Sequence, residues 1–76
     1  MKKRQNNELP KFIFTSALST LMYARHLSQL ALSKKLGIRQ SQISNWLHSK
    51  SLPGYESIQI LCKYFEIEAN YFFQVS

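Results

Sequence analysis

The stretch from residue 29 to residue 47 constrains what this chain can fold into more than any other part of it. Gly37 divides this stretch into two short segments and stands where a tight turn needs a positive φ, which glycine adopts without steric cost. Ser33 is small at the position where two steeply crossing helices would collide over a larger side chain. Ile38 is apolar and can fill the angle between those helices. Together these offsets predict a helix-turn-helix.

Apolar residues elsewhere recur at helical rather than strand spacing, so we expect an all-α chain. Phe14, Leu18 and Leu21 lie on one face of a helix, and Ser28 is a suitable N-cap for the next one. We expect five short helices: one from Pro10 to about residue 25, one from the Ser28 cap through Leu36, and three more over about 40–48, around 58–65 and over 69–73.

Length and composition exclude several classes of protein. The chain has 76 residues, enough for one domain, and its single cysteine, Cys62, excludes a disulfide framework. We expect Cys62 to be a small buried apolar residue, with a redox role as the alternative. His26 and His48 form no cluster at zinc-ligand spacing, and the four acidic residues are too scattered for a catalytic pair. We therefore expect no enzyme activity, no cofactor and no metal site.

Charge is distributed unevenly along the chain. The net charge is +6, yet residues 1–50 hold nine basic residues and one acidic residue, whereas residues 51–76 hold one basic and three acidic residues. This asymmetry favours a polyanionic partner, most simply nucleic acid. A basic surface that only keeps the domain soluble is the alternative.

We expect residues 1–9 to form a flexible basic arm and residues 10–76 to form one domain. The basic start followed by an apolar stretch imitates a secretory signal, but Glu8 and Pro10 interrupt the join. No run approaches the ~20 apolar residues of a membrane span. We therefore expect a cytoplasmic protein with no membrane partner.

The predicted third helix carries a polar face without acidic residues. Gln40, Ser41, Ser44, Asn45 and His48 fall together at i, i+1, i+4, i+5 and i+8. Glutamine and asparagine can form paired hydrogen bonds to adenine edges, and serine can bond either purine. This face predicts contact with DNA bases, with a plain polar surface as the alternative.

The chain resembles the Cro/C1-type (XRE) helix-turn-helix family over about residues 14–73. The resemblance rests on the pattern Gln29-x-x-Leu32-Ser33-x-x-x-Gly37-Ile38-x-x-Ser41-x-Ile43-Ser44-x-Trp46, followed by Pro53 and Leu61-Cys62-x-x-Phe65-x-Ile67. It implies a compact five-helix bundle of the lambda-repressor-like type and a regulator that binds double-stranded DNA. Phage repressors, restriction-modification controller proteins and antitoxins all belong to this family, and the residues do not separate them.

The resemblance also implies roles for single residues. Gln40, Ser41 and Asn45 match positions that contact base edges, and Ser44 shares their face. The positions that match phosphate contacts are Ser28, Gln29, His48 and Lys50. Arg39, where the family commonly has serine or threonine, adds a charge that would face the phosphates.

The chain departs from the family pattern at several positions. The family often pairs a glutamate at the position of Leu47 with an arginine at the position of Met22. Because both partners are apolar here, we expect these two side chains to contact each other. Arg39 lacks a capping side chain, and Ser49 stands where the family commonly has glycine.

The C-terminal end is rich in aromatic residues that cannot all face inward from so short a helix. We expect Phe72 to fill the core and Tyr71, Phe73 and Val75 to form an exposed patch, which Tyr55, Ile60 and Tyr64 could join. Such a patch predicts a homodimer on an inverted repeat, with the two recognition helices about 34 Å apart. Simple overfilling of a small core, or a docking site for a regulatory protein, are the alternatives.

Overall fold

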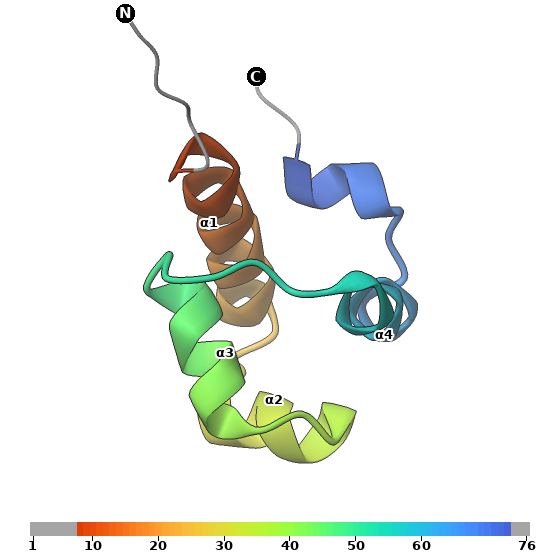
Figure 1. The fold of residues 1–76 in the computed structure, drawn as a ribbon. Coiled ribbons are helices and arrows are strands. Elements are labelled where there is room, and N and C mark those ends of the chain that lie inside the picture. Colours follow the sequence, from red (N-terminus) through yellow and green to blue (C-terminus); the bar gives the residue numbers. More distant parts are fainter. Residues whose placement is uncertain (1–7, 74–76) are drawn as a thin grey trace, which may run out of the picture.

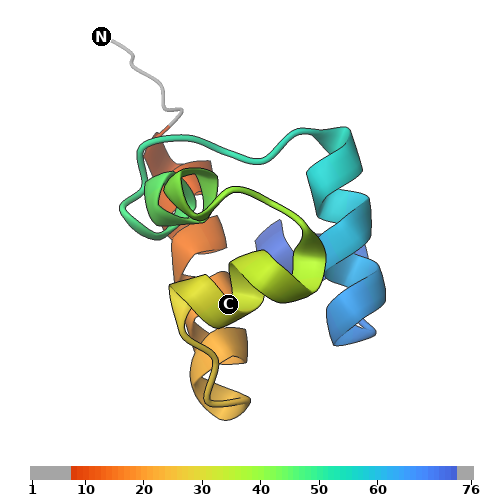
Figure 2. The ribbon, with the colours of Figure 1, turned by 90° about the horizontal axis from the view of Figure 1, so that it is seen from below.

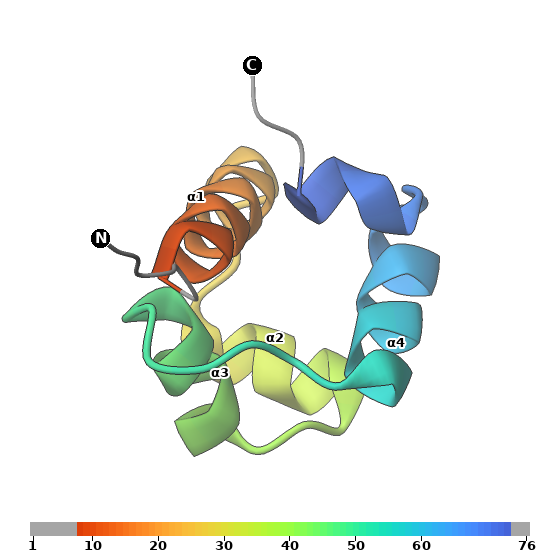
Figure 3. The ribbon, with the colours of Figure 1, turned by 45° about the horizontal axis from the view of Figure 1, so that its top comes forward.

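The computed structural model describes residues 8–73. It contains four α-helices and one 3₁₀-helix: α1 (Glu8–Ala24), α2 (Gln29–Leu36), α3 (Gln40–Leu47), α4 (Tyr55–Phe65) and η1 (Ala69–Phe73) (Figure 1). Within these residues there is no strand, which confirms the all-α prediction. From below, α3 points toward the viewer while α2 lies across the view, so the two cross steeply (Figure 2). The elements form a ring around one core (Figure 3).

Two predictions need correction: the type of the fifth helix and the residue at which the first helix begins. The fifth helix, η1, is a 3₁₀-helix and not an α-helix, so the five-helix bundle is four α-helices and one 3₁₀-helix. Its Tyr71 amide donates to the carbonyl of Glu68 at 3.0 Å, the i to i−3 bond that suits a segment too short for α-helical pairing. The first helix begins at Glu8, before Pro10, which lies in the first turn, where a missing amide proton is tolerated. Glu8 and Leu9 of the predicted arm are thus helical, and its residues 1–7 lie outside the described residues.

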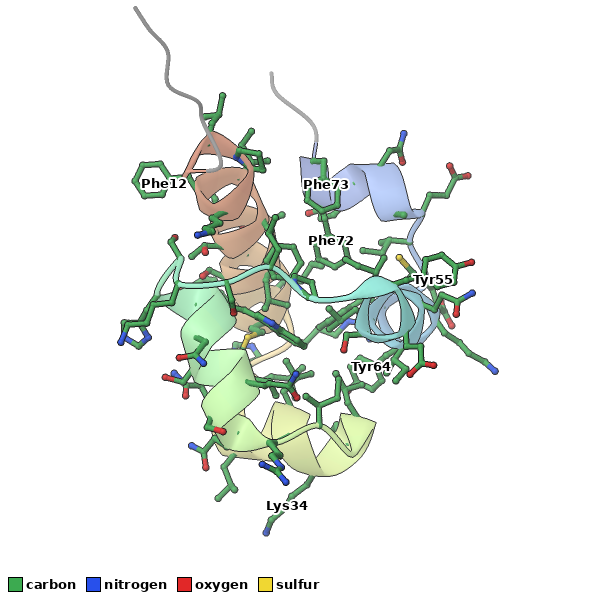
Figure 4. All side chains as sticks on the ribbon, in the orientation of Figure 1. Phe12, Lys34, Tyr55, Tyr64, Phe72 and Phe73 are labelled. Carbon is green, nitrogen blue, oxygen red and sulfur yellow. The ribbon has the colours of Figure 1, made fainter. Side chains whose placement is uncertain are left out.

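Phe14 lies at the centre of the core and joins three elements. Its ring meets Trp46 of α3 edge-on at 6.0 Å between centroids, and it lies 4.9 Å from Phe72 of η1. Phe72 is fully buried and points inward, as predicted (Figure 4). The other buried core residues are Leu18, Met22, Leu32, Ile38, Ile43, Leu61 and Phe65. Leu47 packs against the same core cluster that contains Met22, while direct contact between the two stays a prediction.

A left-handed residue follows each of the four α-helices. These residues are His26 (φ 57°), Gly37 (φ 69°), Ser49 (φ 58°) and Glu66 (φ 59°). In this conformation the following amides can turn back and bond the last carbonyls of the helix. Only Gly37 adopts it without the steric cost that a Cβ atom brings.

None of the helices within residues 8–73 has the length and apolar character needed to cross a lipid bilayer.

Candidate nucleic-acid interface

Hydrogen bonds hold both the start of α2 and the turn that leads from α2 to α3. The Ser28 hydroxyl accepts the amide of Ala31 at 3.0 Å and caps α2. The amides of Gly37 and Ile38 donate to the carbonyl of Ser33, at 2.9 and 3.3 Å. The Ser33 hydroxyl donates to the carbonyl of Ile38. Ile38 is buried and Gly37 has a left-handed φ of 69°, as the sequence predicted for this turn.

Helix α3 divides into an inner and an outer face. Ile43 and Trp46 are buried on the inner face. Gln40, Ser41 and Asn45 are exposed. Their amide and hydroxyl groups are therefore free to bond an external partner.

Ser44 and His48 lie on the same side of α3, and the His48 ring contacts the carbonyl and the hydroxyl of Ser44. The His48 Nδ1 atom lies 2.7 Å from the Ser44 carbonyl oxygen and 3.4 Å from its hydroxyl. Because a carbonyl only accepts, Nδ1 is the donor in its contact with the Ser44 carbonyl, and the His48 side chain is exposed. Ser44 is half-buried, so it is the least accessible of the four predicted base-contacting residues.

Exposed cations stand at both ends of α3. Arg39 is its N-cap residue and makes no side-chain capping bond, as expected. Lys50 follows the helix, and both side chains are exposed. The first amides of α2, which follow Ser28, have no partner within the helix and carry the positive end of its dipole. Positive potential therefore surrounds an uncharged polar face.

Arg25 is basic but faces away from this surface. Its guanidinium donates to the carbonyl of Phe65 at 3.3 Å and lies over the rings of Tyr64 and Phe65, at 5.6 and 5.2 Å from their centroids. Its charge therefore meets the carbonyl end of α4. In the sequence, Arg25 counts toward the basic half of the chain. Its partner, the Phe65 carbonyl, is 40 positions away, so no local sequence signal could indicate this contact.

A hydroxyl pair fixes the segment after α3. The Thr15 hydroxyl of α1 donates to the Trp46 carbonyl and lies 2.8 Å from the Ser49 hydroxyl. Sequence reasoning missed this pair. Ser49 could have been noticed, because it stands where the resembled family commonly has glycine. Nothing in the sequence indicated Thr15.

The predicted C-terminal patch is smaller than expected. Phe73 is 41% exposed, Tyr71 is half-buried against the core, and Val75 lies outside the described residues. Tyr55 points away from the core and is exposed, but Tyr64 is half-buried beneath Arg25 (Figure 4). Among the predicted patch residues near this end, Phe73 and Tyr55 are the exposed aromatics.

Cys62 is half-buried and packs against the core. Burial raises the pKa of its thiol, because desolvation disfavours the thiolate. This environment suits a small apolar residue better than a reactive thiol. Within residues 8–73, no three His, Cys, Asp or Glu side chains gather where they could hold a metal ion.

Comparison with known proteins agrees with this geometry. The solution structure of the SOS-response transcriptional repressor LexA from Eubacterium rectale superposes with a TM-score of 0.81 and 21% identity, over 95% of this chain and 74% of that one, which shows a shared fold. The comparison with curated protein sequences gives no match. Residues 21–72 match the family described as Helix-turn-helix. Because this match spans more than half of the residues, the chain belongs to the Cro/C1-type (XRE) helix-turn-helix family of DNA-binding transcription regulators.

Proposed function

We propose that the chain regulates transcription by reading a specific sequence in double-stranded DNA, with α3 in the major groove. The observation that carries this proposal is the exposed, acid-free face of Gln40, Ser41 and Asn45, with Arg39 before it and Lys50 after it. Side-chain amides discriminate bases, whereas the flanking cations bind phosphates of any sequence.

The proposed contacts divide into two groups. Gln40, Ser41 and Asn45 contact base edges, with a smaller contribution from half-buried Ser44. Phosphates are bound by the groups that surround this face: Ser28, Gln29, Arg39, His48 and Lys50. The Ser28 hydroxyl already caps α2, so this residue acts through the free amides at the helix start.

We further propose a homodimer that binds an inverted repeat. The exposed ring of Phe73 lies at the centre of the proposed interface, flanked by Tyr71 and Val75. A two-fold axis there would present two α3 helices to successive major grooves, about 34 Å apart.

A binding selection tests the proposal. Purified protein is equilibrated with random duplex DNA at near-physiological salt, and the bound fraction is sequenced over several rounds. Enrichment of an inverted repeat is the expected result, and its spacing reports the distance between the two α3 helices. Weak, salt-sensitive retention of every sequence would contradict specific reading, because phosphate contacts alone give that behaviour.

The alternative candidate function is binding of another protein, by a chain that uses this fold without reading DNA. The observation that favours it is the exposed apolar surface of α4, where Tyr55 is 77% and Ile60 is 40% exposed. The same selection separates the two functions, because an interaction module enriches no sequence.

A further inference from the structure

The segment after α3 has a conformation that its sequence disfavours. Ser49 has a φ of 58°, where a side chain crowds the backbone and glycine would not. The Ser49 amide donates to the Trp46 carbonyl at 3.2 Å, and the Lys50 amide donates to the Asn45 carbonyl at 2.8 Å. These two bonds form a Schellman turn, which fixes the direction in which the chain leaves α3.

A side chain from another helix supports this turn. The Thr15 hydroxyl bonds both the Trp46 carbonyl and the Ser49 hydroxyl. Since the carbonyl can only accept, Thr15 uses its single proton there, and Ser49 must donate to the oxygen of Thr15. The Ser49 hydroxyl therefore donates to Thr15, and Thr15 in turn donates to the carbonyl of Trp46 in the last turn of α3.

The pair lies beside the phosphate-binding end of the proposed DNA surface. His48 and Lys50 flank Ser49 and are both exposed, while Thr15 and Ser49 are half-buried. If Ser49 leaves the left-handed conformation, the backbone directions on both sides of it change. The directions in which the His48 and Lys50 side chains leave the backbone would then change relative to each other.

We infer that Thr15 is a positioning residue for DNA binding: through the Ser49 hydroxyl it holds the turn that presents His48 and Lys50 to the phosphate backbone. The inference rests on the proposed DNA-binding function. A residue of α1 would thus position the phosphate-binding groups at the C-terminal end of α3. The N-terminal end of α3, where Gln40 lies, would not depend on Thr15.

The test compares variants of the full chain. Thr15→Val removes the hydroxyl at nearly constant shape, and Thr15→Ser retains it. Thr20→Val is the matched control, because the Thr20 hydroxyl is exposed and, among residues 8–73, bonds only the Ser16 carbonyl of its own helix, at 3.0 Å. Ser49→Ala removes the other member of the pair and serves as a second variant should Thr15→Val not fold.

Two readouts are measured. The first is hydrogen exchange of the Lys50 amide in the free protein, by NMR. The second is the slope of log affinity against log salt on a duplex recovered from the selection, together with the ratio of affinities for that duplex and a random one. Thr15→Val and Ser49→Ala should accelerate Lys50 exchange and lower the salt slope by about one unit, because about one phosphate contact is lost. The affinity ratio should stay unchanged, since base contacts lie elsewhere on α3.

Rescue separates positioning from general destabilisation. Adding Ser49→Gly to Thr15→Val should restore the slope, because glycine holds a positive φ without support. Thr15→Ser and Thr20→Val should behave like the wild type. An unchanged slope in Thr15→Val with DNA still bound, or an equal loss in Thr20→Val, would overturn the inference. If the wild type binds no duplex, the proposed function fails, whereas Lys50 exchange in the free protein still decides whether Thr15 holds the turn.

Discussion

Single residues decide how each helix of this chain ends. Four residues with positive φ follow the four α-helices, and Gly37 is the one whose chemistry suits that conformation. For His26, Ser49 and Glu66 the surrounding bonds must offset about 1–2 kcal/mol of steric cost each. The sequence reveals the glycine, but the other three residues adopt this conformation because the tertiary fold requires a turn there.

Replacing Gly37 isolates the backbone cost of this conformation. A Cβ atom at Gly37 would meet nothing within 4 Å, so Gly37→Ala adds no clash and should lower the free energy of unfolding by about 1–2 kcal/mol through φ alone. Gly54 is the control: its φ is −75° and its surroundings are equally open. Gly54→Ala should lower the free energy of unfolding by only about 0.5 kcal/mol, because alanine is a poorer N-cap for α4 than glycine but meets no strain at this φ. Equal effects of the two substitutions in urea unfolding would contradict the explanation.

Gln40 provides the test of base reading. Gln40→Ala should weaken binding to the selected duplex by about 1–3 kcal/mol and leave binding to random DNA nearly unchanged, because a bidentate amide bonds one base. Gln59→Ala is the matched control, since Gln59 is exposed on α4 and bonds the Tyr55 hydroxyl at 3.2 Å. Both affinities can be measured by fluorescence anisotropy. Equal losses on the two duplexes would remove Gln40 from base contact.

Whole elements show where periodicity suffices and where it fails. Helices α2 and α3 follow the prediction because their caps and apolar residues act over four positions or fewer, as Ser28 does on Ala31. The fifth helix was predicted from its apolar residues, yet η1 is a 3₁₀-helix. Burial of Phe72 against Phe14 fixes this segment, and packing does not require α-helical pairing.

Arg25 connects two elements, and its removal should loosen them. Arg25→Leu loses the bond to the Phe65 carbonyl and the contacts with the two rings, which together should lower the free energy of unfolding by about 1–2 kcal/mol. The salt slope of DNA binding should not change, because this guanidinium lies on α4 and not beside α3. Arg25→Lys retains the charge without the planar group and should recover part of the stability. A lowered salt slope in Arg25→Leu would place Arg25 in the DNA interface instead.

At the level of the whole molecule, the proposed DNA surface and the proposed dimer contact lie on different elements. The exposed cations Arg39 and Lys50 flank α3, whereas the exposed ring of Phe73 belongs to η1, which packs on α1. The two surfaces can therefore be used at once, one for DNA and one for a second copy of the chain. Aromatic composition alone predicted this patch, and of its two members in η1 that the structure describes, Phe73 is exposed whereas Tyr71 packs against the core.

The proposed dimer is tested at Phe73. Phe73→Glu places a charge at the centre of the proposed interface and should raise the dimer dissociation constant by at least about tenfold, which corresponds to about 1.4 kcal/mol. Tyr23→Glu is the control, since Tyr23 is an exposed tyrosine of α1 that belongs to neither the predicted patch nor the apolar surface of α4. Sedimentation velocity over a concentration series measures both variants. Unchanged association in Phe73→Glu would move the dimer interface to another surface.

Three features could be predicted from neighbours along the chain: the capped start of α2, the left-handed turn at Gly37 and the division of α3 into buried and polar faces. These features arise from bonds and periodicity within a few residues. The roles of Arg25 and Thr15, in contrast, follow from how the helices pack. Their partners lie 40 and 31 to 34 positions away, and contacts at that separation exist only once the helices have packed around Phe14.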